Sequence, residues 1–417
     1  MNLLSINKFY YIKGGSETYL FALEEELKRE GHSIYQFSMK DNKNKDSITS
    51  QYFVENIDYN NAGIIDKLKL APKIIFSYEA YKNICELLKM HKVDLAHLHI
   101  FQHQLSPSIL FPLKKKKIPV VYTVHDLKPL CPNYKMLTND KVCELCKGNK
   151  FYNVVLNKCT KDSLVASTLS MFEAYIHKFL GIYENYIDHF ITPSNFYREK
   201  MIDWGIPAHK VTHIPNFVNP SSFKVNYNPG NYFLYLGRLS NEKGIKTLIK
   251  SVKQSSDNIS LKIVGDGLLK DDIKQYIKDN SLEDRIELLG FKQGDELEEL
   301  IRGCKAVVMP SEWYENGPLS LIESFAYGKP VIGSNIGGIP EHIDHMENGI
   351  LFEAGNFKDL AEKITLINNL DETDLIDLGK NARKKVEEVY NSSFHMKKLM
   401  QVYNLVQDNK VYEYKGE

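Results

Sequence analysis

The hydrophobic and polar positions along the chain follow two spacings. Short apolar runs that end in glycine, proline or polar clusters predict buried strands, and longer stretches with an apolar residue every three or four positions predict amphipathic helices. The predicted strands, some with the loop that follows, lie at 3–6, 34–39, 93–99, 118–124, 190–192, 211–216, 232–236, 261–267, 285–291, 306–310 and 331–334. The predicted helices lie at 16–30, 62–91, 163–188, 357–370, 373–390 and 394–411. This alternation predicts an α/β protein with parallel, doubly wound sheets.

A chain of 417 residues exceeds what one hydrophobic core usually supports, so we expect two domains. The N-terminal domain is placed at 1–218, with a cysteine-rich insertion at about 131–162, and the C-terminal domain at 219–393. The polar stretch between 220 and 230 is rich in Pro, Ser, Asn and Gly, which is typical of a linker. Residues 394–417 are expected to form a helix that packs back on the N-terminal domain.

One stretch in the second half predicts a loop that turns into a helix with an anion site at its start. Gly317 ends the loop, Pro318 suits a first helical turn, and Gly328 stops the helix. The backbone N–H groups near Leu319 and Ser320 would then be available to a phosphate.

Two carboxylates flank this predicted anion site. Glu315 precedes it in the loop with Asn316, and Glu323 follows it on the helix. Their separation suits contacts with different ends of one long ligand whose phosphates lie between them.

A second loop supplies positive charge. Gly237 and Arg238 follow a predicted strand, and Lys243 comes five residues after Arg238. An Arg for bidentate contact and a Lys as a point charge suit a diphosphate; the alternative is a solvated pair balanced by Glu242. Gly265 sits in a similar glycine turn, and Phe291 is a candidate wall for a nucleotide base.

Two features of the first half stand at predicted carboxyl ends of strands, where open α/β sheets bind ligands. The pair Gly14–Gly15 precedes a helix and indicates either a phosphate-side crevice or a tight turn. His125 and Asp126 form a titratable pair; the alternative is a histidine satisfied by its neighbours in a buried turn.

Four of the six cysteines, Cys131, Cys143, Cys146 and Cys159, fall in one polar region. The Cys-x-x-Cys spacing of the middle pair is typical of metal-binding knuckles, and four thiolates suit a structural, tetrahedral zinc. An iron–sulfur cluster and buried free thiols are the alternatives. We expect these thiols to do no chemistry.

Composition and charge narrow the class of protein. Hydrophobic residues make up 43% and charged residues 25%, as in ordinary globular proteins, and the formal net charge of zero argues against nucleic-acid binding. The start of the chain turns polar too soon for a signal peptide, and no apolar run reaches membrane-spanning length. We therefore expect a cytoplasmic protein. The run Lys114–Lys117 indicates a solvated helix end or a patch that contacts anionic lipid on the inner membrane face.

Taken in order, these motifs resemble the retaining, GT-B-fold glycosyltransferases of family four, also called group 1 glycosyltransferases. The resemblance rests on Gly14–Gly15, His125–Asp126, Gly237–Leu239 with Glu242–Gly244, and Glu315-x7-Glu323 followed by Gly337-Gly338-x-x-Glu341. It covers nearly the whole chain and is most specific over 232–345. It implies two Rossmann-like domains that face each other across a cleft, the first on the acceptor side and the second binding the donor.

The resemblance also implies roles. Arg238 and Lys243, with the amides of Leu319 and Ser320, would bind the donor diphosphate, Glu323 the ribose, and Glu315 with Asn316 and Gly317 the sugar hydroxyls. His125 would contact the sugar from the other domain, and Gly15 would line the acceptor-side wall. Catalysis is thus assigned to His125, Arg238, Lys243 and Glu315, and donor binding to Gly14, Gly15, Gly237, Arg238, Lys243, Gly265, Phe291, Glu315, Asn316, Gly317, Pro318, Leu319, Ser320 and Glu323.

The implied reaction moves a hexose from a nucleotide-diphosphate sugar, a UDP-sugar before a GDP-sugar, to a saccharide or lipid-linked saccharide with retained configuration. Catalysis would need no metal, because Arg and Lys neutralise the leaving diphosphate. Two rivals are a non-catalytic sugar-nucleotide-binding subunit and an epimerase or phosphorylase on the same two-domain plan.

Overall fold

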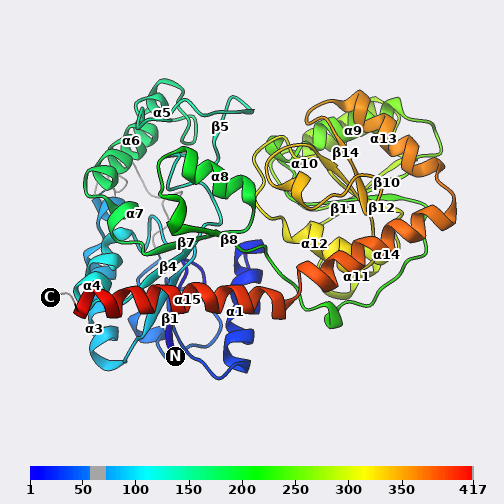
Figure 1. Cartoon of the computed structure of the whole chain (residues 1–417). Helices are drawn as coiled ribbons and strands as arrows, with labels where there is room; N and C mark the ends of the chain where they lie inside the picture. Colours follow the sequence, from blue (N-terminus) through cyan, green and yellow to red (C-terminus); the bar gives the residue numbers. More distant parts are fainter. Residues whose placement is uncertain (57–71, 416–417) are drawn as a thin grey trace. The chain divides into compact units, whose positions relative to one another are not determined.

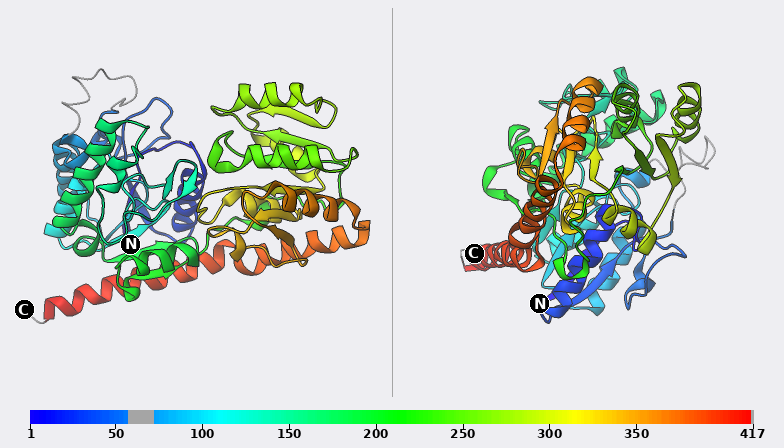
Figure 2. Two further views of the ribbon diagram at one scale, coloured as in Figure 1. Left: turned by 90° about the horizontal axis from the view of Figure 1, so that it is seen from above. Right: turned by 90° about the vertical axis from the view of Figure 1, so that its right-hand side faces the viewer.

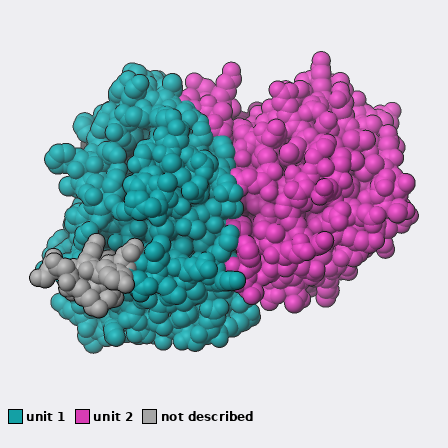
Figure 3. Space-filling model, viewed as in Figure 1, with its two compact units in different colours: residues 1–136, 144–214, 395–417 teal, residues 137–143, 215–394 magenta. Residues whose placement is uncertain are grey.

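The computed structural model describes residues 1–56 and 72–415, and these divide into two compact units (Figure 3). Unit 1 comprises Met1–Met136, Glu144–Ile214 and the chain from His395 on. Unit 2 comprises Leu137–Cys143 and Pro215–Phe394. Each unit contains its own parallel sheet with helices on both faces (Figure 1).

Unit 1 has a six-stranded parallel sheet in the order β2-β1-β3-β4-β7-β8. Its strands are β1 Asn2–Ile6, β2 Ser33–Phe37, β3 Leu95–Leu98, β4 Val120–Thr123, β7 His189–Thr192 and β8 Val211–His213. Its helices are α1 Gly15–Arg29, α3 Tyr78–Met90, α4 Leu110–Lys115, α5 Asn153–Leu156, α6 Leu164–Phe179, α7 Ile182–Asn185, α8 Asn195–Asp203 and α15 Ser392–Lys415, which starts in unit 2.

Unit 2 repeats this plan with the order β11-β10-β9-β12-β13-β14, again all parallel. Figure 2 shows helices of this unit, coloured from green to orange, on both sides of its sheet. Its strands are β9 Phe233–Leu236, β10 Leu261–Val264, β11 Ile286–Gly290, β12 Ala306–Met309, β13 Val331–Ser334 and β14 Gly349–Phe352. Its helices are α9 Ile245–Gln254, α10 Lys270–Asp279, α11 Gly294–Arg302, α12 Leu319–Ala326, α13 Phe357–Asn369 and α14 Glu372–Val389. A short antiparallel hairpin, β5 Leu137–Thr138 with β6 Lys141–Val142, also groups with unit 2.

The strands form where the sequence has short apolar runs, because both faces of each sheet are covered. In unit 2, Phe233 and Tyr235 of β9 pack with Ile263 of β10 and Val308 of β12, all at most 2% exposed. Strands buried on both faces read as continuous apolar runs rather than as an alternating pattern. The predicted α/β class with doubly wound sheets is confirmed.

Two predicted helices differ from the structure. The stretch 163–188 is not one helix: α6 ends at Phe179, and Gly181, with φ 60°, separates it from α7. Glycine adopts this left-handed conformation without a Cβ clash, so the helix breaks there. Within the predicted helix 62–91, α3 occupies Tyr78–Met90, and residues 62–71 lie outside the described ranges.

The polar stretch 220–230 packs on unit 2. Asn226 donates its backbone N–H to Tyr327 O and its side-chain amide to Arg302 O. Lys329 Nζ donates to Asn228 O at 2.8 Å. The chain changes units earlier, between Ile214 and Pro215.

The C-terminal helix α15 contacts the core of unit 1 through two buried hydrogen bonds. Tyr19 of α1 and His395 share one of 3.0 Å, and His97 of β3 and Tyr403 share one of 2.7 Å. Within the part of the chain that the structure describes, no helix has both the length and the apolar character needed to cross a bilayer.

Candidate functional site

The strand order of unit 2 brings two candidate loops together. Strand β9 lies between β10 and β12. From β9 the chain adds β10 and β11 on one side of the sheet, and then β12, β13 and β14 on the other side. The loop after β9 carries Arg238 and Lys243, and the loop after β12 carries Glu315. In open α/β sheets, ligands bind at the carboxyl ends of strands where the order reverses.

Two glycines, one after β9 and one after β13, allow their loops to touch the loop after β12. Gly244 has φ 67°, and a Cβ there would lie 1.7 Å from the carbonyl oxygen of Pro310, just after β12. Gly337 has φ 62°, and a Cβ there would lie 2.6 Å from the backbone N and O of Glu315. The next residue, Gly338, donates its N–H to Glu315 O at 2.8 Å. Glycine is required at both contacts, and the Glu315 backbone is held from two sides.

The centre of the site is an ion pair between Lys243 and Glu315. Lys243 Nζ lies 2.6 Å from Glu315 Oε1, and Ser311 Oγ donates to the same oxygen at 2.6 Å. The ammonium also lies 5.3 Å from the ring centroid of Trp313. Burial by itself would raise the pKa of Glu315, but the charge and hydrogen bond of Lys243, together with Ser311, hold that pKa below its usual value. The carboxylate is therefore ionised and oriented.

Arg238 presents its guanidinium at the surface beside this pair. Its side chain is 63% exposed and lies 3.7 Å from the carboxylate of Glu242, which is buried. Its backbone oxygen accepts a 2.7 Å hydrogen bond from the hydroxyl of Tyr235. The loop backbone is thus fixed, while most of the guanidinium can reach an anion.

The N-terminus of α12 is an uncapped helix end next to Glu315. The N-cap residue, Pro318, has no side chain that could accept a hydrogen bond from the first turn at Leu319 and Ser320. The preceding carbonyl, that of Gly317, accepts a 2.6 Å hydrogen bond from Asn216 Nδ2. First-turn N–H groups without an acceptor attract anions.

Glu323 lies one turn further along α12. Burial raises its pKa, and within the described residues its carboxylate makes no hydrogen bond or ion pair. A half-buried carboxylate of this kind gains from hydroxyl donors supplied by a ligand.

The remaining donor-side residues lie along the same edge. Gly237 and Gly265 follow the neighbouring strands β9 and β10, and Gly237 N–H donates to Val264 O at 3.1 Å. Phe291 follows β11, separated from β9 by β10, and its ring is 69% exposed. Asn316 lies between Glu315 and Gly317 in the loop that leads into α12.

In unit 1, the glycine pair marks the start of α1. Gly14 is the N-cap and Gly15 the first helical residue, and no side chain caps this end. The first turn carries Glu17, which is buried and accepts hydrogen bonds from Ser16 Oγ at 3.0 Å and Asn7 Nδ2 at 3.3 Å. Burial raises the pKa of Glu17.

His125 follows β4 and belongs to a group of aromatic and imidazole rings. Its Nε2 lies 3.1 Å from Nδ1 of His99, which follows the neighbouring strand β3. The Tyr19 ring packs edge-on against it at 5.4 Å between centroids. Burial lowers the pKa of His125 to about 4, so the imidazole is neutral at physiological pH. In the described part of the chain its Nδ1 has no hydrogen-bond partner, which leaves that atom for a ligand.

Asp126 hydrogen-bonds the backbone of its own loop, and among the described contacts it makes none to His125. Its Oδ1 accepts the backbone N–H of Lys128 at 3.0 Å, and burial raises its pKa. The role of Asp126 is to shape the turn that presents His125.

We expect unit 1 to lose stability in acid, because its buried histidines resist protonation in the folded state. The imidazole of His97 shares one hydrogen bond with the hydroxyl of Tyr403 and another with that of Thr123. Burial lowers the pKa of His97 to about 3. The unfolded chain then binds more protons than the folded chain below pH 6.5, so this stability is present above that pH and is lost as the pH falls. Between pH 7 and pH 5, His97 alone is expected to cost about 2 kcal/mol. Thermal midpoints at the two pH values, with His97→Asn as the comparison, measure this; an equal midpoint shift in both proteins would contradict it.

The structure does not gather the four cysteines of the insertion into one group. Among all described His, Cys, Asp and Glu side chains, no group of three or more lies together as metal ligands would. Cys143 ends the β5–β6 hairpin, which groups with unit 2, whereas Cys131, Cys146 and Cys159 belong to unit 1. Burial raises the pKa of the Cys131 thiol to about 11. The structural zinc site at these four cysteines therefore stays a prediction that the described geometry does not support.

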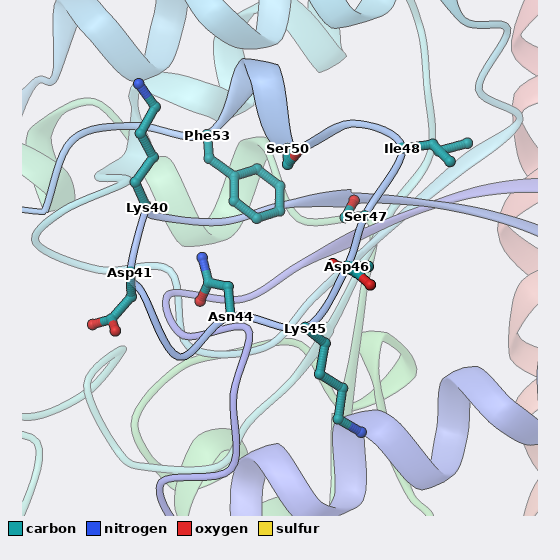
Figure 4. A pocket seen from close by; sticks show the side chains of 9 residues that line it. All are labelled: Lys40, Asp41, Asn44, Lys45, Asp46, Ser47, Ile48, Ser50 and Phe53. Carbon is teal, nitrogen blue, oxygen red and sulfur yellow. The ribbon is translucent and has the colours of Figure 1, made fainter.

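Unit 1 also has a surface hollow of about 530 Å³ in the segment after β2 (Figure 4). It is lined by Lys40, Asp41, Asn44, Lys45, Asp46, Ser47, Ile48, Ser50 and Phe53. The backbone N–H of Lys45 donates to Tyr10 O, so the hollow adjoins the loop that leads to Gly14. Its mixed charges suit a polar ligand.

Sequence reasoning missed two residues of these sites. Ser311 hydrogen-bonds Glu315, and His99 hydrogen-bonds His125. The signal for His99 was a polar His97-x-His99 pair in an otherwise apolar strand, which only the neighbouring position of β3 and β4 makes meaningful.

Family comparisons cover almost the whole chain. The model of Glycosyltransferase Family 4 matches residues 13–222, which is half of the chain, and the model of Glycosyl transferases group 1 matches residues 220–385. The boundary between these matches lies near the change from unit 1 to unit 2.

Two relatives illustrate the range of similarity. The chain is 29% identical over 221 residues to the amylovoran biosynthesis glycosyltransferase AmsK of Erwinia amylovora, a match that covers 50% of this chain and 54% of that protein. The chain thus spans about half the length of that relative. It is 28% identical over 373 residues to an uncharacterized glycosyltransferase of Methanocaldococcus jannaschii, with 88% and 89% covered.

Two solved structures show the fold. Sucrose-phosphate synthase from Thermosynechococcus elongatus has a TM-score of 0.72 at 21% identity, with 97% of this chain and 98% of that chain covered. Anabaena HepE in complex with UDP and glucose has a TM-score of 0.67 at 18% identity, with 97% and 99% covered. The chain has the α/β GT-B fold of two Rossmann-like units.

Proposed function

The chain belongs to glycosyltransferase family 4, and we propose that it transfers a hexose-type sugar from a nucleotide-diphosphate sugar to a saccharide or lipid-linked saccharide, with retained configuration. The observation that carries this proposal is the Lys243–Glu315 pair, set at the switch point of unit 2 beside the uncapped end of α12. One cation, one ionised carboxylate and one helix N-terminus within a single loop pair suit a ligand that has both a diphosphate and hydroxyl groups.

The diphosphate would be held from three directions. Arg238 offers an exposed planar guanidinium, Lys243 a compact ammonium, and α12 its first-turn N–H groups. As the bond to the sugar breaks, negative charge grows on the leaving diphosphate, and preorganised cations stabilise that charge. This supply of positive charge is why we propose that catalysis needs no metal.

The two carboxylates would bind opposite ends of the donor. Glu323, whose carboxylate makes no hydrogen bond or ion pair among the described residues, would accept hydrogen bonds from the ribose hydroxyls. Glu315, with the backbone of Asn316 and Gly317, would hold the hydroxyls of the sugar. Glu315 is already engaged by Lys243 and Ser311, which argues against its use as a covalent nucleophile.

We propose that the acceptor hydroxyl attacks on the face from which the diphosphate leaves, through an oxocarbenium-like state, with the departing phosphate as base. In unit 1, Nδ1 of the neutral His125 would contact the sugar, and Gly14–Gly15 would line the acceptor side. The hollow after β2 (Figure 4) would take part of a saccharide acceptor.

The donor is proposed to be a UDP-sugar, because HepE, of the same fold, is described with UDP and glucose. Synthesis of a cell-surface polysaccharide or glycoconjugate is proposed from the similarity to AmsK, which is named for amylovoran biosynthesis. We place the enzyme in the cytoplasm, at or near the inner face of the membrane.

Nucleotide release from a panel of UDP- and GDP-sugars, with and without a lipid-linked saccharide, tests the proposal. Acceptor-dependent release of UDP supports it. Turnover without an acceptor indicates an epimerase, turnover that needs inorganic phosphate indicates a phosphorylase, and binding without turnover indicates a non-catalytic subunit.

Replacing Glu323 with Gln is expected to raise KM for the nucleotide sugar about tenfold to a hundredfold, because the ribose hydroxyls no longer donate hydrogen bonds to a charged carboxylate. The effect on kcat should be small, since the ribose is bound alike in the ground and transition states. Initial rates against donor concentration measure both constants. Glu362→Gln on the helix α13 is the matched control, and a fall in kcat at unchanged KM would contradict the ribose assignment.

A further inference from the structure

Helix α6 of unit 1 has its polar residues buried and its apolar residues exposed. The buried side consists of Ser167, Ser170, Glu173 and His177, each at most 9% exposed. The exposed side chains on the helix include Val165 at 70%, Phe172 at 53% and Phe179 at 91%. This is the reverse of the pattern expected for a surface helix of a globular protein.

Specific polar contacts fix this orientation. Glu173 Oε2 accepts a 2.8 Å hydrogen bond from Lys128 Nζ, and both side chains are buried. Ser167 Oγ accepts the backbone N–H of Thr160 at 3.0 Å, and Ser170 Oγ accepts the Thr160 hydroxyl at 3.1 Å. Rotation of α6 would leave the buried ammonium of Lys128 without a carboxylate to balance its charge, which is strongly unfavourable.

The exposed apolar side chains form one continuous stripe, which we call the α6 face. It consists of Leu164, Val165, Phe172, Tyr175, Ile176, Phe179 and Leu180. The stripe follows the whole helix, about 24 Å at 1.5 Å per residue. Tyr152 and Leu156, near and on α5, are exposed as well, and α5 packs against α6. A contiguous apolar surface of this extent marks an interaction site.

The charges around the α6 face are mainly positive. Between Leu164 and Leu180 the one exposed charged side chain is Lys178, which pairs with Glu184 of α7 at 2.5 Å, so the excess positive charge comes from the lysines on either side of the helix. Before the helix, Lys158 and Lys161 are exposed, with Asp162. After it, the exposed run Lys114–Lys117 adjoins α7, because Lys114 Nζ donates to Asn185 O at 2.8 Å. Figure 1 shows α5, α6, α7 and α4 in succession along one side of unit 1.

We propose that the α6 face is a membrane-docking surface that inserts its aromatic and aliphatic side chains into the interface of a bilayer with anionic lipids. Bulky apolar side chains on one helical stripe, bordered by lysines, match how interfacial helices bind. Each lysine near an anionic surface adds attraction that salt weakens. A second protein copy would gain nothing from the excess of lysines, because like charges would meet across a symmetric contact.

This inference deepens the proposed function and rests on it in one respect, the nature of the acceptor. The buried side of α6 is tied through Glu173 to Lys128, three residues after His125. The Glu173–Lys128 contact therefore joins the α6 face to the loop that carries His125. A bilayer bound to the α6 face would keep the His125 loop near lipid-linked saccharides.

Flotation of the full chain with vesicles tests the docking surface. We expect binding to vesicles of phosphatidylglycerol and phosphatidylcholine, and at least tenfold weaker binding to phosphatidylcholine alone or at high salt. Phe172→Ser and Phe179→Ser should each lower the partition coefficient about tenfold, because one large apolar side chain is withdrawn from the lipid. Leu268→Ser is the matched control, since Leu268 is 98% exposed but lies in unit 2.

The outcomes separate the occupants. Loss of vesicle binding in the α6 variants, with melting midpoints unchanged and wild-type binding retained in Leu268→Ser, supports the proposal. Absence of vesicle binding by the wild type overturns it. A wild-type dimer in solution that Phe179→Ser converts to a monomer, without vesicle binding, assigns the face to a second copy instead. Donor turnover with a soluble saccharide is measured in parallel, so failure of docking is distinguishable from failure of the proposed transferase activity.

Discussion

Replacing Lys243 with Met is expected to lower kcat for sugar transfer about a hundredfold to a thousandfold, the usual cost of losing one preorganised group that stabilises transition-state charge. The same change should also lower stability by about 3 kcal/mol, because the buried Glu315 carboxylate loses the ammonium that lies 2.6 Å away. Steady-state kinetics and urea denaturation measure the two effects separately.

A double substitution separates catalysis from folding. Glu315→Gln combined with Lys243→Met removes both charges, so most of the lost stability should return, whereas activity should stay at or below that of the single variants. The exposed pair Lys384–Glu388 is the control: Lys384→Met should change neither quantity measurably. If the double variant recovered activity together with stability, the pair would be structural only.

Replacing His125 with Ala is expected to lower kcat about a hundredfold, because a hydrogen bond from a neutral imidazole to the sugar is lost in the transition state. Since burial lowers the pKa of His125 to about 4, the wild-type rate should show no titration of this group between pH 6 and 8. A pH–rate limb near 6.5 that disappears in His125→Ala would contradict the neutral form.

His99 offers a graded comparison for the same site. Its Nδ1 bonds Nε2 of His125 at 3.1 Å, so it orients the imidazole without being assigned a contact with the substrate. His99→Ala should lower kcat about tenfold and leave the donor KM unchanged, and the loss should not add to that of His125→Ala. His209→Ala, at an exposed position of unit 1, is the control. Equal, additive losses would indicate independent roles.

The sequence pattern predicted a helix at α6 but not which of its sides faces the core. The spacing of apolar residues predicted a helix over 163–188, and α6 and α7 lie there. The period does not say which side of a helix faces the core, because both the apolar stripe and the Ser167–Ser170–Glu173 stripe repeat with helical spacing. Burial of the polar stripe was decided by a partner distant in sequence, Lys128.

In the cysteine region, the spacing in the sequence likewise did not determine which side chains lie together in space. The Cys143-x-x-Cys146 spacing is a local property, but a four-ligand site also needs Cys131 and Cys159 to converge on this pair. Convergence depends on how the hairpin β5–β6 folds, and the structure does not gather the four thiols. Spacing fixes which ligands are near in sequence and leaves open which are near in space.

By itself the sequence determined the elements, their parallel arrangement and the loops that carry chemistry, because hydrophobic period, glycine placement and charge at strand ends are local properties. Arg238, Lys243, Glu315 and Glu323 could all be singled out in this way. Only the tertiary structure decided that β9 lies beside β12, which makes Lys243 and Glu315 partners, and that β3 lies beside β4, which places His99 on His125. Strand order is set by packing between segments far apart in the chain, and no local pattern records it.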